Sequence, residues 1–528
     1  MSTSDTPRAG AIETWQIRKP AVETDAGMVA SQHHVASDIG ARVLADGGNA
    51  VDAAVAAGLA IGTVEPWMSG LGGGGQMIVY LAAEGRAYNV DFGMRAPRDL
   101  DPGAYPLTGA GTDDDLFGWP AVLEERNVNG PLAMAVPGFV AGMAMALARF
   151  GTLSWRDALA PAIDSARRGM VVDWYATLKI ASAALVLSRY PESARVYLPG
   201  GFAPSGEWGG PVPTLVLGQL ADTLERLAEA GARDFYEGEV ARAIVADCTQ
   251  LGCPLSGADL AHYEAAVREP ETFSYRDATV HAAPGLTAGP TLRRALARLA
   301  ERHRPGDAPD ADTYAAFAAS LAEAYAERLE TMGDEIETRA PTSTTHLSVV
   351  DRDGNAVALT QTLLSVFGSK VVLPQSGILM NNGIMWFDPR PGRPNSMAPG
   401  KRPLSNMCPT VVETGDGRRF AVGASGGRRI MPAVMQLVSF LTDFRMDVES
   451  ACHQPRIDMS GAPPVIADAR LPDDVVRRLA AAHAVVRAQN TVYPALFACP
   501  NLVLHDARRG VRVGGAFVTS PWSKASAG

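Results

Sequence analysis

The residues with the clearest chemical potential are the hydroxyl side chains of residues 342–345 (Thr-Ser-Thr-Thr), about two-thirds of the way along the chain. An alternating segment follows at residues 346–350, then Asp353-Gly354-Asn355, and then a second strand-like segment from 356 to about 363. Asp-Gly between two such segments predicts a β-hairpin. The hairpin would begin at Thr344.

Cleavage of the peptide bond before Thr344 would give this residue two catalytic groups. Its hydroxyl could act as the nucleophile, and its new α-amine could act as the general base for that hydroxyl. Without cleavage the same residues are only the edge of a β-strand, which is the ordinary role of a short Thr/Ser run.

Several elements must position this threonine. Residues 36–44 favour a helix, and Asn49 caps a second helix over residues 50–60, which is rich in alanine. Four glycines at 72–75 precede a strand at 77–81 and lack the lysine of a P-loop. They therefore predict a close backbone approach beneath a site or against another strand.

The rest of the chain divides into a helical and a strand-rich part. Apolar spacing predicts that residues 130–340 are largely helical. Residues 1–27 read as a polar tail on the surface, and residues 332–343 as an exposed linker where cleavage is plausible. Strands and glycine turns dominate after Thr344, with a late helix at about 474–483. The predicted helices are 141–149, 155–168, 217–230, 239–251, 291–302 and 311–331.

Composition excludes several classes of protein. The chain has 528 residues, of which 47% are hydrophobic and 20% charged, as in ordinary globular proteins. The net charge of −10 argues against a nucleic-acid partner, and no window resembles a membrane span. Residues 1–8 lack the apolar core of a secretory signal, so we expect a cytoplasmic protein, or a periplasmic one if a leader was removed.

The cysteines and histidines do not suggest a metal or cofactor. Five scattered cysteines predict reduced thiols, and the pair Cys248 and Cys253 has no second Cys/His pair for zinc. We expect His33 and His34 to be solvated, and His346 to be structural because Thr344 would use its own amine as the base. No metal or cofactor is expected.

Six motifs in order resemble the γ-glutamyltranspeptidase family of N-terminal-nucleophile hydrolases, over residues 29 to about 456. They are residues 47–54 (Gly-Gly-Asn-Ala-Val-Asp-Ala-Ala), 69–75 (Ser-Gly-Leu-Gly-Gly-Gly-Gly), 136–138 (Val-Pro-Gly), 344–355 (beginning Thr-Thr-His), 401–405 (Lys-Arg-Pro-Leu-Ser) and 426–430 (Gly-Gly-Arg-Arg-Ile). No single motif is decisive, but their order is highly specific.

The resemblance implies an α+β fold, the four-layer αββα sandwich. It implies autocleavage between Ser343 and Thr344 into a large, mainly helical subunit 1–343 and a small subunit 344–528, which stay together as a heterodimer. Thr344 would attack a small γ-glutamyl-type amide, as in glutathione metabolism, and the acyl group would pass to water or an amine. Thr362 would hydrogen-bond the nucleophile, and the backbone N–H groups of Gly426 and Gly427 would form the oxyanion hole.

The chain departs from the family where the α-amino group of the substrate is bound. Leu364 stands where the family usually has Asn, Gly383 where it has Gln, and Trp386 where it has Asp or Glu. Loss of these acceptors would leave a buried ammonium group unpaired. The pocket therefore predicts an acyl group without an α-amine, such as a glutaryl-, oxamate- or aromatic-acyl-like group, unless other residues bind a γ-glutamyl group.

The carboxylate-binding residues are partly kept. Ser405 remains from the family's serine pair, and Asn406 replaces the second serine. The place of the family's arginine falls near Pro102, so Arg95 or Arg98 would have to substitute for it.

Two other classes of function compete with this interpretation. The chain could be an unprocessed, non-catalytic homologue with a binding role. It could also be a serine hydrolase that uses Ser425 in residues 423–427 (Gly-Ala-Ser-Gly-Gly), although the sequence shows no clear strand–turn–helix context for it.

Overall fold

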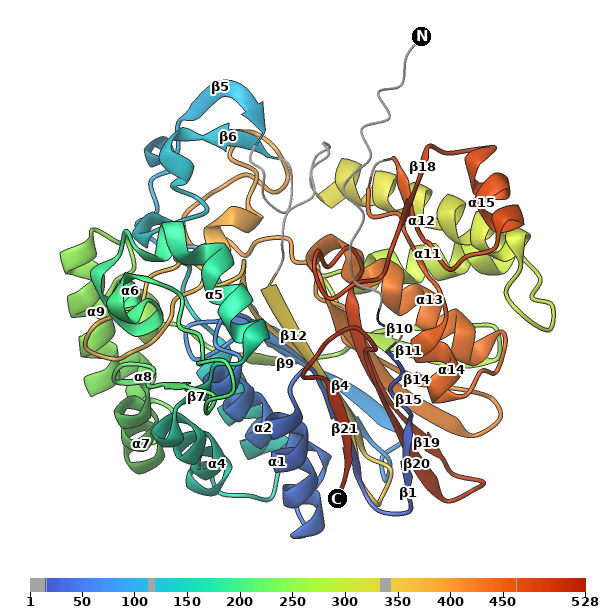
Figure 1. Ribbon diagram of the computed structural model, residues 1–528, viewed down its shortest axis with the longest axis horizontal. Helices are drawn as coiled ribbons and strands as arrows, with labels where there is room; N and C mark the ends of the chain where they lie inside the picture. Colours follow the sequence, from blue (N-terminus) through green and yellow to red (C-terminus); the bar gives the residue numbers. More distant parts are fainter. Residues whose placement is uncertain (1–14, 16, 113–118, 333–342, 462) are drawn as a thin grey trace.

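Two seven-stranded antiparallel sheets lie face to face at the centre of the molecule (Figure 1). The computed structural model describes residues 15, 17–112, 119–332, 343–461 and 463–528. The first sheet has the strand order β21 (Lys524–Ala527), β2 (Met28–Ser31), β12 (Ser343–Val350), β13 (Ala356–Leu364), β3 (Gly74–Leu81), β4 (Arg86–Phe92) and β9 (Ala266–Arg268). The second has the order β1 (Val22–Thr24), β20 (Val511–Ala516), β19 (Cys499–Asp506), β15 (Arg418–Ser425), β14 (Thr410–Glu413), β11 (Ala278–Ala282) and β10 (Glu271–Tyr275).

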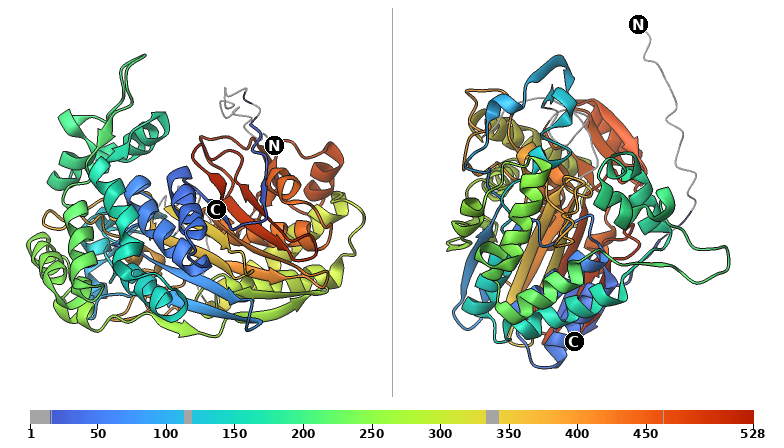
Figure 2. Two further views of the ribbon diagram at one scale, coloured as in Figure 1. Left: turned by 90° about the horizontal axis from the view of Figure 1, so that it is seen from below. Right: turned by 90° about the vertical axis from the view of Figure 1, so that its left-hand side faces the viewer.

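Helices cover the outer face of each sheet, which gives the predicted αββα order (Figures 1 and 2). Outside the first sheet are α1 (His34–Ala45), α2 (Ala50–Val64), α3 (Phe139–Phe150), α4 (Trp155–Arg168), α5 (Trp174–Leu187), α6 (Pro191–Tyr197), α7 (Leu220–Ala230), α8 (Asp234–Glu237), α9 (Glu239–Leu251) and α10 (Gly257–Ala261). Outside the second are α11 (Gly289–Arg302), α12 (Ala311–Met332), α13 (Ile430–Thr442), α14 (Val448–His453) and α15 (Asp473–Ala480).

Three hydrophobic cores hold these layers together. One lies between α2 and its neighbouring helices and the first sheet, and another lies between α11–α13 and the second sheet. The third lies between the sheets and consists of small and medium side chains such as Ala30, Ile78, Ala358, Ala421 and Val503. Alternate residues of a strand face opposite sides, so each sheet contributes to two cores.

Small two- and three-stranded sheets lie outside the two main sheets. They are formed by β5 (Leu107–Thr112) with β6 (Pro120–Val122), by β7 (Met170–Val171) with β8 (Thr214–Leu215), and by β16 (Ile457–Asp458), β17 (Val465–Asp468) and β18 (Val485–Ala488). None of the helices in the described part of the chain is both long and apolar enough to cross a bilayer.

The predicted helices are confirmed, with boundaries that differ by a few residues. Asn49 caps α2 as expected, since its side chain accepts hydrogen bonds from the backbone N–H groups of Val51 and Asp52. Helices α5, α6, α8, α10, α13 and α14 and strands β9–β11 were not predicted, and α13 and α14 interrupt the part after Thr344 where strands and turns were expected. The apolar residues of α5 include exposed ones such as Leu185, which obscures a helical stripe, and β10 and β11 lie in a region otherwise dominated by helices.

The predicted N-terminal tail and the predicted linker before Thr344 are only partly described by the structure. Residues 22–24, predicted to belong to a tail, form β1 and pair with β20, because the edge of the second sheet offers free backbone groups. The remainder of that tail is mostly outside the described residues, as are residues 333–342 of the predicted linker.

Candidate active site

The β12–β13 hairpin positions Thr344 as predicted. Ser343 pairs with Leu364 and Thr345 with Gln361, so the register shifts at Thr344 and creates an irregularity at this residue. At the other end of the hairpin, the Asp351 carboxylate accepts hydrogen bonds from the backbone N–H groups of Asp353 and Asn355. Gly354 completes the turn with φ of 84°. A register shift like the one at Thr344 redirects a side chain within a strand.

Two threonine hydroxyls converge on the carbonyl group of Ser343. Thr344 Oγ1 donates to Ser343 O over 2.5 Å, and Thr362 Oγ1 donates to the same oxygen over 2.6 Å. The two hydroxyl oxygens are 3.1 Å apart. The carbonyl that precedes the predicted nucleophile is therefore polarised by both hydroxyl groups.

This junction is buried, contrary to the expectation of an exposed linker at its last residue. Ser343 is fully buried and Thr344 is 4% exposed. The Ser343 hydroxyl donates to the carbonyl of Trp67, which is also buried. Ser343 is inaccessible because it is already the first residue of β12, in the middle of the first sheet.

The glycine run lies against the strand that carries Thr362, as the sequence predicted. A Cβ atom at Gly73 would lie 2.4 Å from the carbonyl oxygen of Thr362, and one at Gly75 would lie 2.4 Å from that of Thr360. Any larger residue would push β3 away from β13.

The glycine pair Gly426 and Gly427 follows the end of β15. Their φ angles are 133° and 57°, in the region that favours glycine. In the described part of the chain, no acceptor is bound to the backbone N–H of either residue. Both N–H groups are thus available to a ligand.

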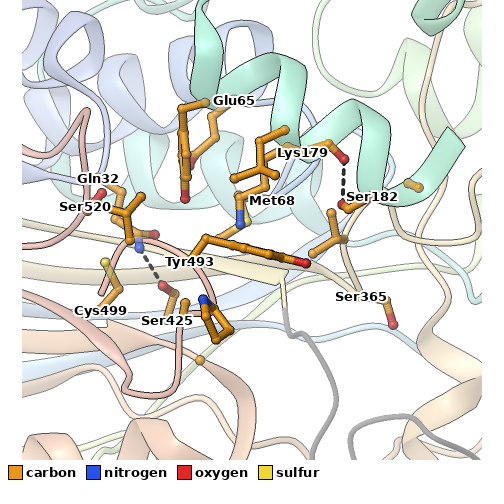
Figure 3. Close-up of a pocket in the computed structure, with 18 of the residues that line it drawn as sticks. Gln32, Glu65, Met68, Lys179, Ser182, Ser365, Ser425, Tyr493, Cys499 and Ser520 are labelled. Atoms are coloured by element: carbon orange, nitrogen blue, oxygen red, sulfur yellow. Dashed lines mark hydrogen bonds between the residues drawn. The ribbon is translucent and has the colours of Figure 1, made fainter. Parts of the chain in front are cut away.

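Gln32 and His346 connect this glycine pair to strand β12. The Gln32 amide donates to Ser425 Oγ and accepts a bond of 3.3 Å from the backbone N–H of His346 (Figure 3). A Cβ atom at Gly423 would lie within 2.3 Å of the His346 ring. Strand β15 therefore packs directly against the start of β12.

The expected lack of a strand–turn–helix context at Ser425 is wrong. Strand β15 ends at Ser425, a short 3₁₀ turn follows at Gly427–Arg429, and α13 begins at Ile430. The Ser425 hydroxyl nevertheless has the Gln32 amide as its partner, and an amide cannot act as the base that a serine nucleophile needs.

The histidines differ in their surroundings. His346 is fully buried between Thr360 Oγ1 and Ser348 Oγ, each 2.9 Å from a ring nitrogen, and burial lowers its pKa to about 3. A neutral ring that is held on both sides fits the predicted structural role. His33 is buried, not solvated, because it caps α1, whereas His34 is exposed.

Three of the predicted substrate-binding residues carry buried polar atoms that have no hydrogen-bond partner among the described residues. They are Arg95 Nε, Ser405 Oγ and Asn406 Nδ2. An unpaired buried donor costs about 1–3 kcal/mol, and a bound ligand or water at these atoms would offset that cost. All three atoms can donate a hydrogen bond to an anionic group. Arg98, in contrast, is exposed.

Leu364 and Trp386, which stand where the family has residues that bind an ammonium group, lie in apolar surroundings. Leu364 and Trp386 are each 3% exposed and belong to one hydrophobic cluster with Met94 and Met407. The neighbouring asparagines do not compensate. Asn381 Oδ1 accepts from the backbone N–H groups of Ala135 and Gly383, and Asn382 Oδ1 accepts from that of Ser365.

Two features of the site were not predicted. Arg328 on α12 is buried and donates to the carbonyl oxygen of Ser405 and to Asn406 Oδ1, at 2.7 and 3.4 Å. A cavity of about 560 Å³ also adjoins Ser425 and Gly426 and contains Glu65 and Lys179 (Figure 3). Glu65 and Lys179 each stand in an otherwise apolar segment, which was the only sequence signal for the cavity, whereas Arg328 lies among glutamates and gave none. In the described residues, no three His, Cys, Asp or Glu side chains form a metal-binding group.

A family model described as gamma-glutamyltranspeptidase matches residues 36–341 and 335–498. The chain belongs to the γ-glutamyltranspeptidase family. It is 32% identical over 508 residues to an acylase ACY 1 proenzyme of Pseudomonas sp. (strain V22), with 89% of each chain covered. It is 33% identical over 487 residues to a glutathione hydrolase proenzyme of Escherichia coli (strain K12), with 82% of this chain and 81% of that one covered.

A solved structure agrees with the fold of this member of the γ-glutamyltranspeptidase family. The cephalosporin acylase from Bacillus halodurans superposes with a TM-score of 0.85 and 25% identity, over 98% of both chains. The chain is thus a hydrolase or acyltransferase of the N-terminal-nucleophile type that acts on amides. Relatives of both kinds, acylases and glutathione hydrolases, are similarly distant.

Proposed function

We propose that Thr344 first cleaves the chain before itself and then serves as the catalytic nucleophile. The observation that carries this proposal is the convergence of the Thr344 and Thr362 hydroxyls on the Ser343 carbonyl. Thr344 Oγ1 would attack the carbonyl carbon, the C–N bond would break, and the hydroxyl proton would pass to the departing nitrogen. Water would then hydrolyse the resulting ester to a Ser343 carboxylate and a free Thr344 hydroxyl and amine.

In the processed enzyme the same hydroxyl would attack a substrate amide. The Thr344 amine would take the hydroxyl proton and pass it to the departing amine. The backbone N–H groups of Gly426 and Gly427 would stabilise the oxyanion, and such a donor is typically worth about 3 kcal/mol. Water or a second amine would release the acyl group.

We propose that the acyl group carries a distal carboxylate but no α-amine, as in a glutaryl amide. The unpaired donors of Arg95, Ser405 and Asn406 suit a carboxylate. The apolar surroundings of Leu364 and Trp386 offer no acceptor for an ammonium group. A site that leaves an ammonium unpaired discriminates strongly against it.

Mass spectrometry of the intact protein tests the nucleophile. We expect wild-type protein to yield fragments 1–343 and 344–528, and Thr344→Ala to stay whole. Thr345→Ala, which alters the adjacent buried hydroxyl, is the matched control and should still be cleaved. A wild-type chain that stays intact at neutral pH would contradict the proposal and favour a non-catalytic role.

A matched pair of chromogenic amides tests the acyl group. Glutaryl 4-nitroanilide and L-γ-glutamyl 4-nitroanilide differ only in the α-amine. We expect kcat/KM to be at least tenfold higher for the glutaryl compound. The reverse preference would show that other residues bind the α-amine and that the protein acts on γ-glutamyl amides.

A further inference from the structure

The cavity beside the glycine pair is separate from the predicted acyl-binding residues. It is lined by Gly426, Ser425 and Met68 at one end and reaches α5 at the other. None of Arg95, Ser405, Asn406, Leu364 and Trp386 lines it. If the acyl group lies against those five residues, the cavity is left for the other half of an amide substrate.

The walls of the cavity suit a compact, flat molecule. Its volume of about 560 Å³ is typical of small-molecule sites. Aromatic side chains from three segments surround it, namely Tyr175, Tyr493, Phe497 and Phe517. Such walls bind an aromatic or bicyclic body through its apolar faces.

Lys179 provides a positive charge inside this aromatic cavity. Its Nζ atom lies 5.0 Å from the centre of the Tyr175 ring, and among the described residues no ion pair to it is present. Burial lowers the pKa of Lys179, and the nearby Glu65 carboxyl opposes this effect. Lys179 is half-buried and lines the cavity (Figure 3). A buried ammonium without a bonded partner is costly, so an anionic ligand would be favoured here.

Glu65 faces the same cavity but does not cancel this charge. It is 3% exposed, and within the described part of the chain its Oε2 atom has no hydrogen-bond partner. Burial raises the pKa of Glu65 to about 8, against the opposing effect of Lys179, so the carboxyl group is largely protonated at neutral pH. A protonated carboxyl group does not repel an anion and can donate a hydrogen bond to one.

We propose that this cavity binds the amine half of the substrate, and that Lys179 selects amines that carry a carboxylate. The amine would be the departing product in hydrolysis or the acceptor in transfer. This inference rests on the proposed function, which places the acyl half of the amide at the acyl-binding residues and so leaves the cavity for the amine half. It assigns to Lys179 and Glu65 a role in specificity.

Isothermal titration calorimetry tests the proposal without any turnover. The probes are 5-amino-2-nitrobenzoate and 4-nitroaniline, which differ in one carboxylate. At pH 7 we expect wild-type protein to bind the carboxylated amine at least tenfold more tightly. Lys179→Met should remove this preference, and Lys179→Arg should keep part of it.

Leu185→Ala is the control, because Leu185 lies exposed on the same helix and does not line the cavity. Its preference should equal that of the wild type. Equal binding of both amines by wild-type protein, or a preference that survives Lys179→Met, would overturn the inference. Chain cleavage is measured on the same samples. Loss of the preference with normal cleavage would refute only the inference, and an uncleaved chain that keeps the preference would refute only the proposed nucleophile.

Discussion

At the scale of single residues, the site depends on two hydroxyl groups that share one acceptor. Thr344 and Thr362 both donate to Ser343 O, and the backbone N–H of Leu364 donates in turn to Thr362 Oγ1 over 2.8 Å. That bond fixes the Thr362 hydroxyl so that its proton points to the carbonyl. A fixed donor stabilises developing negative charge without reorganisation.

Removal of this donor should slow self-cleavage. We expect Thr362→Ala to lower the cleavage rate about 100- to 1,000-fold, the usual cost of losing one oxyanion donor. Thr362→Ser keeps the hydroxyl and should cleave within about tenfold of the wild-type rate. The appearance of fragment 344–528 over time, followed by mass spectrometry, gives the rates. Equal rates for Thr362→Ala and wild type would remove Thr362 from the mechanism.

At the scale of elements, the position of Thr362 depends on how closely β3 approaches β13. The two strands pair from Ala356 with Tyr80 to Thr362 with Gly74. The end of this ladder next to the site is formed by glycines, and the carbonyl of Thr362 occupies the space that a side chain at Gly73 would need. The glycines at 72–75 therefore allow β3 to lie close enough to β13 for the two strands to pair.

A methyl group at Gly73 should disturb both stability and cleavage. We expect Gly73→Ala to lower the free energy of unfolding by about 1–3 kcal/mol, as overpacking does, and to slow cleavage. Gly70→Ala is the control in the same motif, since its nearest contact would be Gly62 O at 3.9 Å. Denaturant unfolding and the cleavage assay together measure the effect. Equal stability of the two variants would show that β3 can shift freely.

At the scale of the whole molecule, the two parts of the chain on either side of Thr344 share both sheets. Strand β12 pairs with β2 on one side, and β13 pairs with β3 on the other. In the second sheet, β14 pairs with β11, and β1 pairs with β20. A cut before Thr344 breaks one peptide bond but none of these ladders.

The fragments should therefore remain a heterodimer after cleavage. We expect 1–343 and 344–528 to elute together in size-exclusion chromatography near the mass of the intact chain. An affinity tag on one fragment should retain the other through washes of 1 M salt, because the contact is mainly apolar and hydrogen-bonded backbone. Only denaturant should separate them. Separation under native conditions would contradict the shared sheets.

Much of the active site could be predicted from local sequence. The hairpin, the cap at Asn49 and the need for glycine at 72–75 each depend on neighbours in the chain, and the structure confirms them. The family, the fold and the class of enzyme were also predicted correctly. The burial of Ser343 and His33 was not, because burial depends on which strands and helices cover a residue.

The sequence by itself determined the residue types of the proposed nucleophile, its hydroxyl partner and the glycine pair, because the proposed chemistry requires those side chains or their absence. Tertiary structure alone decided which charges share a space. Glu65, Lys179 and Gly426 are far apart in the chain, and only the packing of α2, α5 and β15 brings them to one cavity. The location of such a cavity, and the pKa of a group inside it, depend on desolvation by distant segments, which no local pattern records.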